Sequence, residues 1–152
     1  MAVCVAAVAL AGCGEVRVQP PAPVTASEWR SNTAIILRQL RDDIAATQIS
    51  GATPAAGRAA LHDESSLYGL LVSYSDFAGC TEMVASAGVV PPSAARAARS
   101  LVAGCRHLEQ ASALFTVAVK ANDGSSLIAA GREAGRALPL LLDATVEMNR
   151  RR

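Results

Sequence analysis

The chain has 152 residues, about half of them apolar, and its 14 Lys and Arg residues nearly balance its 13 Asp and Glu residues. This length suits one domain with a single core, and the near-zero net charge argues against nucleic acid as the principal partner. The apolar residues are mostly Ala, Leu and Val, with one Trp, two Tyr and two Phe. That composition favours helices over sheets.

The first element is an uncharged apolar run that closes on Leu10-Ala11-Gly12-Cys13. The run is shorter than the roughly 20 residues that span a bilayer, but it has the length of a signal-peptide core. Its last four residues resemble the lipobox of bacterial lipoprotein precursors. The resemblance implies a signal peptide over residues 1–12, cleavage between Gly12 and Cys13, and a diacylglycerol on the Cys13 thiol. The expected partner is then the membrane, with the protein held by a lipid anchor on the extracytoplasmic face of the cell membrane.

The position of the motif in the chain distinguishes it from a chance match. Val102-Ala103-Gly104-Cys105 fits the same four-residue pattern, but only the first copy ends an N-terminal apolar run and precedes a proline-rich segment. No Lys or Arg precedes the run, and the alternative interpretation is an uncleaved apolar segment. Residues 13–26 hold three prolines and no periodicity. They predict an extended tether, of roughly 3 Å per residue in its proline-rich part, between Cys13 and a helical domain at 27–152.

The four cysteines can be assigned one by one. Cys4 would leave with the signal peptide and Cys13 would be acylated, so Cys80 and Cys105 remain as a pair. Outside the cytoplasm such a pair is expected to form a structural disulfide, contributing about 3 to 3.5 kcal/mol by loop closure. The alternatives are two free buried thiols or a redox or metal site, although the close Cys-x-x-Cys spacing of redox pairs is missing.

Apolar periodicity predicts four long helices joined by short loops. The first starts at a cap formed by Thr25 with Glu28, or by Ser27, and ends near Ser50-Gly51. Its predicted core stripe is Trp29, Thr33, Ile36, Leu37, Leu40, Ile44 and Thr47. The second helix restarts at Thr53-Pro54 and runs to Gly79, or with a bend to Gly88.

The third helix follows the break at 89–93 and stops at Asn122-Asp123-Gly124, where a residue can adopt positive φ. Ser125 or Ser126 caps the fourth helix. Pro139 lies inside the fourth helix and is expected to bend it near Gly135, while Gly131 and Gly135 would let a neighbouring helix approach closely. The predicted fold is therefore all-α, a four-helix up-down bundle with a disulfide between helices two and three.

The sequence predicts no catalytic residue, no cofactor and no metal site. His62 and His107 would lie some 24 Å apart along the bundle, too far for one metal. Asp76, His107 and Glu109 could gather near the disulfide as an acid–base group, but no nucleophile accompanies them, and a solvated face is the simpler interpretation.

The function expected from the sequence is that of a binding or scaffold module of the cell envelope, without catalysis. The chain resembles the uncharacterised helical lipoproteins of high-GC Gram-positive bacteria, a resemblance limited to the lipobox and the general texture. Its partner would be an envelope protein or a small apolar ligand, and not nucleic acid. The alternative function is a carrier or sensor that holds a small molecule or lipid in an apolar pocket between the helices.

Overall fold

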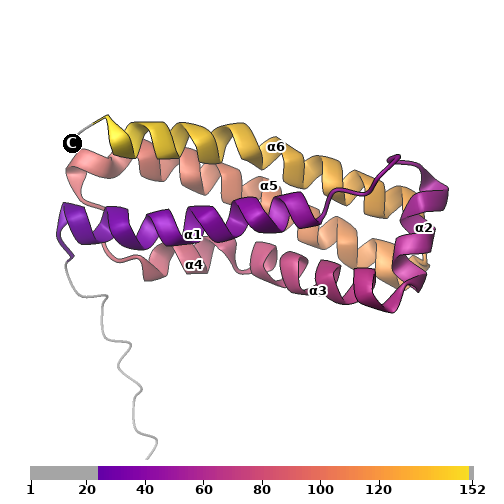
Figure 1. The fold of residues 1–152 in the computed structure, drawn as a ribbon. Coiled ribbons are helices and arrows are strands. Elements are labelled where there is room, and N and C mark those ends of the chain that lie inside the picture. Colours follow the sequence, from indigo (N-terminus) through magenta and orange to yellow (C-terminus); the bar gives the residue numbers. More distant parts are fainter. Residues whose placement is uncertain (1–23, 151–152) are drawn as a thin grey trace, which may run out of the picture.

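A computed structural model describes residues 24–150, and all the regular structure in this part of the chain is helical (Figure 1). The elements are α1 (Ala26–Ala46), α2 (Pro54–His62), α3 (Glu64–Ala78), α4 (Cys80–Ser86), the short 3-10 helix η1 (Pro92–Ala94), α5 (Ala95–Ala121) and α6 (Gly124–Asn149). The all-α prediction is confirmed for the described residues.

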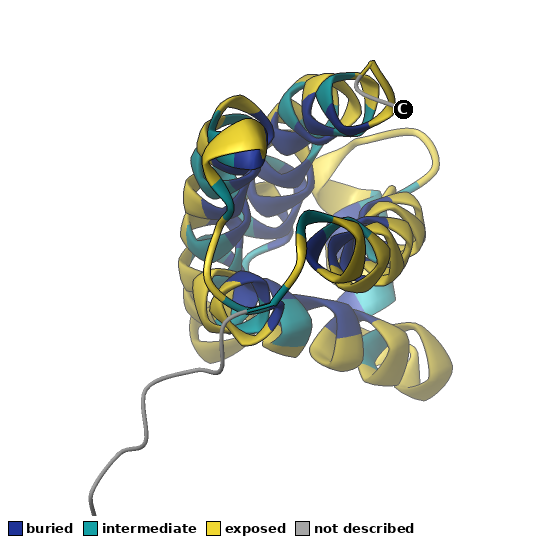
Figure 2. Cartoon of the chain, turned by 90° about the vertical axis from the view of Figure 1, so that its left-hand side faces the viewer, coloured by how far each residue is buried: buried dark blue, intermediate teal, exposed yellow. Residues whose placement is uncertain are grey.

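The helices form an elongated molecule in which successive long segments alternate in direction (Figure 1). α1, α5 and α6 run along the long axis, as does α3, which α4 follows in nearly the same direction, while α2 lies across one end. Seen from the other end, the buried residues of the long helices face a shared interior (Figure 2). The described chain begins and ends at the same end of the molecule, so Val24 and the last turn of α6 lie at that end.

The start of α1 follows the predicted capping box. The Glu28 amide donates to the Thr25 hydroxyl, and the Thr25 amide donates to the Glu28 carboxylate at 2.8 Å. Val24 packs against the core, so the last residues of the predicted tether, 24–26, belong to the folded part. The predicted core stripe of this helix is buried throughout.

The end of α1 was predicted about four residues too late. Thr47 is buried and its hydroxyl donates to the Ile44 carbonyl at 2.9 Å, which occupies an acceptor at the end of the helix. The chain then turns through Gly51 and Ala52, both with positive φ. The helix therefore ends at Ala46, because Thr47 satisfies its last turn before the glycine is reached.

The prediction of one second helix is wrong, because this part of the chain forms three separate helices, α2, α3 and α4. Thr53 and Pro54 start α2 as predicted. The Asp63 backbone is extended, and its carboxylate accepts from the Ser66 amide at 2.8 Å to begin α3. Gly79 separates α3 from α4. The disulfide Cys80–Cys105 therefore joins α4 to α5, not the second helix of the chain to the third.

At the junction of α5 and α6, the predicted end of the third helix is confirmed and the predicted cap of the fourth helix is wrong. Asn122 adopts the left-handed conformation that ends α5. Asp123 caps α6, because its carboxylate accepts from the amides of Ser125 and Ser126. An acidic side chain at this position also complements the positive end of the helix dipole.

α6 continues through Pro139, which lies inside the helix as predicted. A Cβ on Gly131 would lie 3.3 Å from the Thr47 carbonyl, consistent with a close approach, whereas one on Gly135 would meet nothing within 4 Å. The prediction of a tight crossing at Gly135 is therefore wrong. The tightest crossing joins α2 to α6, where a Cβ on Gly57 would clash with the Gly124 backbone.

The interior is filled by aromatic and aliphatic side chains. Tyr74 stacks on Phe115, with ring centroids 4.3 Å apart, and meets Phe77 edge to face. Between α5 and α6 the buried side chains are largely small, which lets these two helices pack closely. They include Ala97, Ala111, Ala118, Ala130, Ala134, Ala137 and Ala144. Within residues 24–150, no helix is both long and apolar enough to cross a membrane.

Candidate functional site

The residues that the sequence predicts for acylation and cleavage, Cys13 and Gly12, lie outside the described residues. The other predicted pair is present as a disulfide, with the Cys80 and Cys105 Cα atoms 5.3 Å apart and both residues fully buried. A buried bond between α4 and α5 acts as a structural link between the two helices.

The two histidines have different partners. His107 on α5 contacts the Glu133 carboxylate on α6, with Nδ1 and Oε1 2.6 Å apart, and Arg136 donates to the other oxygen of that carboxylate at 2.7 Å. The Glu133 side chain is 7% exposed. His62 instead contacts the Asn122 amide at the far end of α5. His107 and His62 therefore serve separate contacts between elements.

The hydrogen bond from His107 stabilises the charged form of Glu133. It holds the pKa of the Glu133 carboxyl below its usual value, with a further contribution from Arg136, although burial alone would raise it. Glu133 is therefore a charged group held between α5 and α6 by two cationic or polar partners.

Asp76, His107 and Glu109 do not come together as an acid–base group. Asp76 accepts from the Gln39 side chain at 2.7 Å, and Glu109 accepts from the Thr81 amide at 3.2 Å, near the start of α4. Each of the three side chains thus joins its own helix to a different neighbour.

A groove of about 720 Å³ lies between α1 and the last turns of α6. Its α6 wall is short and comprises Thr145, Met148 and Asn149. Its α1 wall comprises Ser27, Arg30, Ser31, Ala34, Ile35, Leu37, Arg38 and Arg41. We call it the α1–α6 groove. None of these described lining residues is acidic, and three of them are arginines.

The spacing along α1 explains why the arginines share one face. At 100° per residue, Arg41 lies about 20° and Arg38 about 80° around the helix from Arg30. At 1.5 Å per residue, Arg30 and Arg41 lie about 16 Å apart along the axis. The core stripe of α1 lies on the adjacent face, so the arginine side chains line the groove beside the core. A ligand in this groove would meet guanidinium groups over about three helical turns.

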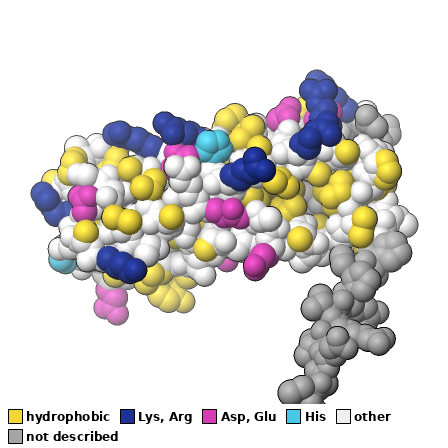
Figure 3. Space-filling view, turned by 180° about the vertical axis from the view of Figure 1, so that it is seen from behind, with side chains coloured by type: hydrophobic (Ala, Val, Ile, Leu, Met, Phe, Trp, Pro, Cys, Tyr) yellow, Lys and Arg dark blue, Asp and Glu magenta, His cyan; other side chains and the backbone are white. Residues whose placement is uncertain are grey.

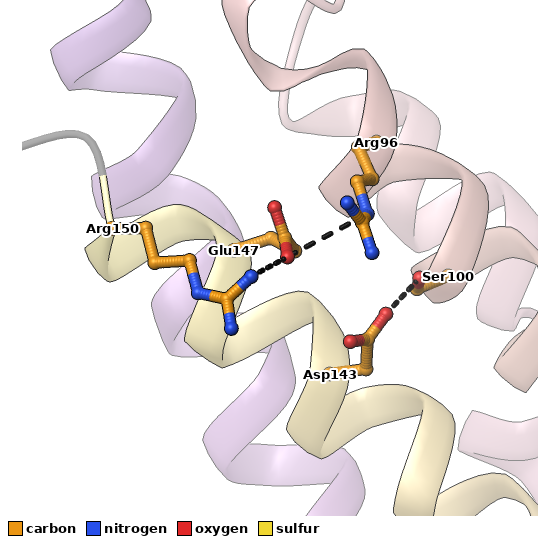
Figure 4. A network of polar contacts seen from close by, with 5 residues as sticks. All are labelled: Arg96, Ser100, Asp143, Glu147 and Arg150. Atoms are coloured by element: carbon orange, nitrogen blue, oxygen red, sulfur yellow. Dashed lines mark hydrogen bonds and ion pairs between the residues drawn. The ribbon is translucent and has the colours of Figure 1, made fainter.

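A polar network fixes α6 against α5 at the end of the groove (Figure 4). The Glu147 carboxylate contacts Arg150 at 2.8 Å and Arg96 at 3.6 Å, and the Ser100 hydroxyl donates to Asp143. The Glu147 side chain is 9% exposed. Glu147 also lines a small hollow with Arg30 and Met148, which adjoins the groove. Glu147 is thus paired with Arg96 and Arg150, two arginines outside the lining of the groove.

This arrangement is suited to binding an anion. Guanidinium groups present several donors in a fixed plane and match carboxylate or phosphate oxygens. The hydroxyls of Ser27 and Ser31 add neutral hydrogen-bonding groups near Arg30. The apolar side chains of Ala34, Leu37 and Met148 would contact the less polar part of a ligand.

Sequence reasoning did not identify the groove, although one signal was available. Arg30, Arg38 and Arg41 are outside the core stripe in the sequence and indicate only a solvated face. Their clustering within about 80° of the helix circumference is visible on a helical wheel. The sequence does not predict the wall that α6 supplies to the groove, because this wall depends on the distance between α1 and α6.

Comparisons with known proteins identify no relative. No family model matches the chain, and neither the curated proteins nor the solved structures contain a match.

Proposed function

We propose that this protein is a lipid-anchored binding module of the cell envelope, on the extracytoplasmic face of the membrane, and that its α1–α6 groove takes an acidic partner. In this proposal residues 1–12 are a signal peptide, Cys13 carries the lipid, and the helices act as a four-helix up-down bundle with α2 as a cap. The partner contributes carboxylate or phosphate groups from an envelope protein or polymer.

The observation that carries this proposal is the charge of the groove. Three arginines line it over three turns of α1, and no described lining residue is acidic. Arg38 and Arg41 lie three residues apart on α1 and repel each other, and a complementary acidic partner relieves that repulsion. The buried disulfide is consistent with an oxidising compartment and so supports the proposed location.

Binding is proposed in preference to catalysis because five of the acidic side chains already have structural roles. Glu28, Asp63 and Asp123 cap helices, while Glu133 and Glu147 pair with cationic or imidazole groups. Each cap or pair fixes a carboxylate at a helix end or between two helices. The groove therefore offers donors for recognition, with no carboxylate and imidazole pair placed among its lining residues.

The alternative, a carrier with an apolar pocket between the helices, receives less support. Trp29, Tyr74, Phe77 and several leucines occupy the interior and are fully buried. The α1–α6 groove is lined mostly by polar and charged side chains and lies along the surface between two helices. An apolar ligand would leave Arg38 and Arg41 without a counter-charge, whereas an acidic ligand would not.

The lipid anchor is tested by metabolic labelling with a palmitate analogue. The wild-type chain is expected to carry the label and Cys13→Ala to lose it. Membrane fractionation should then move the variant to the soluble fraction. Labelling that persists in Cys13→Ala rejects the proposed acylation site.

The groove is tested with a fluorescent poly-L-glutamate peptide and the full chain in a non-ionic detergent. Replacing Arg38 and Arg41 by Gln is expected to weaken binding on the order of tenfold, equivalent to about 1.4 kcal/mol. Arg58→Gln with Arg132→Gln removes the same charge elsewhere and serves as the matched control. Equal losses in the two double variants would mean that only net charge matters, and the groove would not be the site.

A further inference from the structure

We infer that a second surface, around Val90 and the first turns of α5, is a docking site for an anionic phospholipid bilayer. This surface is separate from the α1–α6 groove. We call it the valine corner and define it by Val89, Val90, Arg99, Val102 and Arg106. Its membrane location rests in part on the lipid anchor proposed above, whereas its chemistry rests on the described residues alone.

The valine corner combines exposed apolar side chains with arginines. Val89 and Val90 are 53% and 40% exposed, on the loop between α4 and η1. Val90 and one face of α5 line a shallow hollow of about 550 Å³, in which Arg99 and Arg106 accompany alanines and Val102. None of the described residues lining this hollow is acidic. Adjacent exposed valines are unfavourable in water and favourable in the interface of a bilayer.

The arginines are placed to face one surface together. Arg99 and Arg106 are seven residues apart, so they lie about 10 Å apart along α5 and within about 20° of the same line. Long arginine side chains keep their charge at the headgroup level while their stems cover apolar neighbours. A surface that is apolar at its centre and basic beside it matches an anionic bilayer better than an acidic peptide, which would leave the valines in water.

The corner lies where the chain enters the folded domain. The loop packs against Val24, because a Cβ on Gly88 would lie 2.6 Å from the Val24 Cγ2 atom. Cys13 precedes Val24 by 11 residues, a reach of at most about 40 Å for a fully extended chain. Figure 3 shows hydrophobic side chains, with basic ones beside them, gathered on this face toward the end where the described chain begins. A lipid on Cys13 would therefore keep the valine corner within reach of the bilayer.

The loop is shaped to hold the valines outward. Pro91 and Pro92 follow Val90 directly and lead into η1. Prolines fix their own φ angles and restrict the residue before them to extended backbone. The Asn32 side chain also donates to the Ala87 carbonyl at 3.4 Å, which ties the start of the loop to α1. The valines are thus presented on a constrained loop and lose little conformational entropy on docking.

The test places a fluorescent reporter at the corner of the full, membrane-purified chain. Val90→Trp is reconstituted into vesicles of phosphatidylcholine with and without phosphatidylglycerol, and quenching by lipids brominated on their acyl chains is measured. Trp29 is the only native tryptophan and is fully buried, so the parent chain gives the background. Val117→Trp, at a 52% exposed position toward the other end of α5, is the matched control.

In the phosphatidylglycerol vesicles, the reporter of Val90→Trp is expected to be quenched several-fold more than that of Val117→Trp. Adding Arg99→Gln and Arg106→Gln to Val90→Trp should remove most of that quenching, as should high salt. Equal quenching of the two reporters, or none in Val90→Trp, overturns the docking site. Equal quenching of Val90→Trp in both kinds of vesicle overturns the role of the arginines.

Intact mass of the same preparation separates this proposal from the lipid anchor. A chain without diacylglycerol would refute acylation of Cys13, while quenching of Val90→Trp on anionic vesicles would still support the valine corner. An acylated Val90→Trp chain whose reporter is not quenched would support the acylation of Cys13 and refute the valine corner. Far-ultraviolet circular dichroism of each variant identifies any that fails to fold. If Val90→Trp fails to fold, Val90→Asp, a smaller polar replacement, is used in its place. The result measured for Val90→Asp is the loss of the contact that the native chain makes with the vesicles.

Discussion

Asp43 on α1 is a partly buried carboxylate with a strongly shifted pKa. It faces α3, where the Ser73 hydroxyl donates to it at 3.3 Å and the Asp76 carboxylate lies nearby. Burial and the neighbouring charge of Asp76 raise the pKa of Asp43 to about 6. Between its ordinary pKa and this value the folded state binds the proton and the unfolded state releases it. The contribution of Asp43 to stability therefore falls as pH rises from about 4 to about 6.

Asp43→Asn should remove the loss of stability that the ionisation of Asp43 causes. At pH 7.5 the variant is expected to be more stable than the wild type by on the order of 1 to 3 kcal/mol, the upper bound set by the pKa shift and the lower by solvent screening. Below pH 4 the two should converge, because Asp43 is then protonated in both states. Urea unfolding at both pH values measures this, with the exposed Asp42→Asn as control. A gain that does not change with pH would rule out titration of Asp43 as the cause.

Glu133 gives the opposite dependence of stability on pH. Its pKa is lowered, so its contribution to stability is present above the ordinary pKa of a glutamate and is lost as pH falls through the lowered value. Glu133→Gln is expected to destabilise the protein at pH 7 by about 1.5 to 3 kcal/mol, the range for hydrogen bonds to a charged group. The deficit should shrink on strong acidification in the same unfolding assay. An undiminished deficit at low pH would indicate lost packing instead.

The contact of α2 with α6 depends on two glycines that have no space for a side chain. A Cβ on Gly57 would meet the backbone of Gly124, which cannot move as a side-chain tip can. Gly57→Ala is therefore expected to cost about 2 kcal/mol or more, by displacing α2 from the end of the molecule. Gly69 provides the control, because it lies on the exposed face of α3 and a Cβ there meets nothing within 4 Å. Gly69→Ala should stabilise by about 0.5 to 1 kcal/mol through helix propensity, and thermal unfolding of both variants tests the contrast.

The same elements explain which parts of the fold can be predicted from sequence. The long helices α1, α5 and α6 carry buried side chains every three or four residues, so periodicity locates them. The interruption at Asp63 depends on a single capping side chain, and the one at Gly79 on a single glycine, within otherwise continuous periodicity. The crossing at Gly57 and the α1–α6 groove depend on distances between helices. Nothing in a local sequence window encodes such distances.

At the scale of the whole molecule, the disulfide holds the shortest α-helix of the described residues. α4 has seven residues, and Cys80 and Val84 are its only buried ones. The bond from Cys80 to Cys105 attaches this helix to α5, whose far longer interface with α6 forms the main body of the fold. The loop that carries the valine corner follows α4 directly, so its position depends on the same bond.

Cys80→Ala with Cys105→Ala should therefore have a global effect and a local one. Closing a loop of 25 residues contributes about 3.5 kcal/mol by the chain-entropy estimate, so the melting temperature should fall by roughly 10 °C. Hydrogen exchange in the native variant should rise in α4 and in residues 87–91 more than in α6, because only the former lose their attachment. In the wild type, reduction under denaturing conditions should add about two daltons. A uniform rise in exchange across all helices would show that the bond acts only through the unfolded state and does not hold α4 in place.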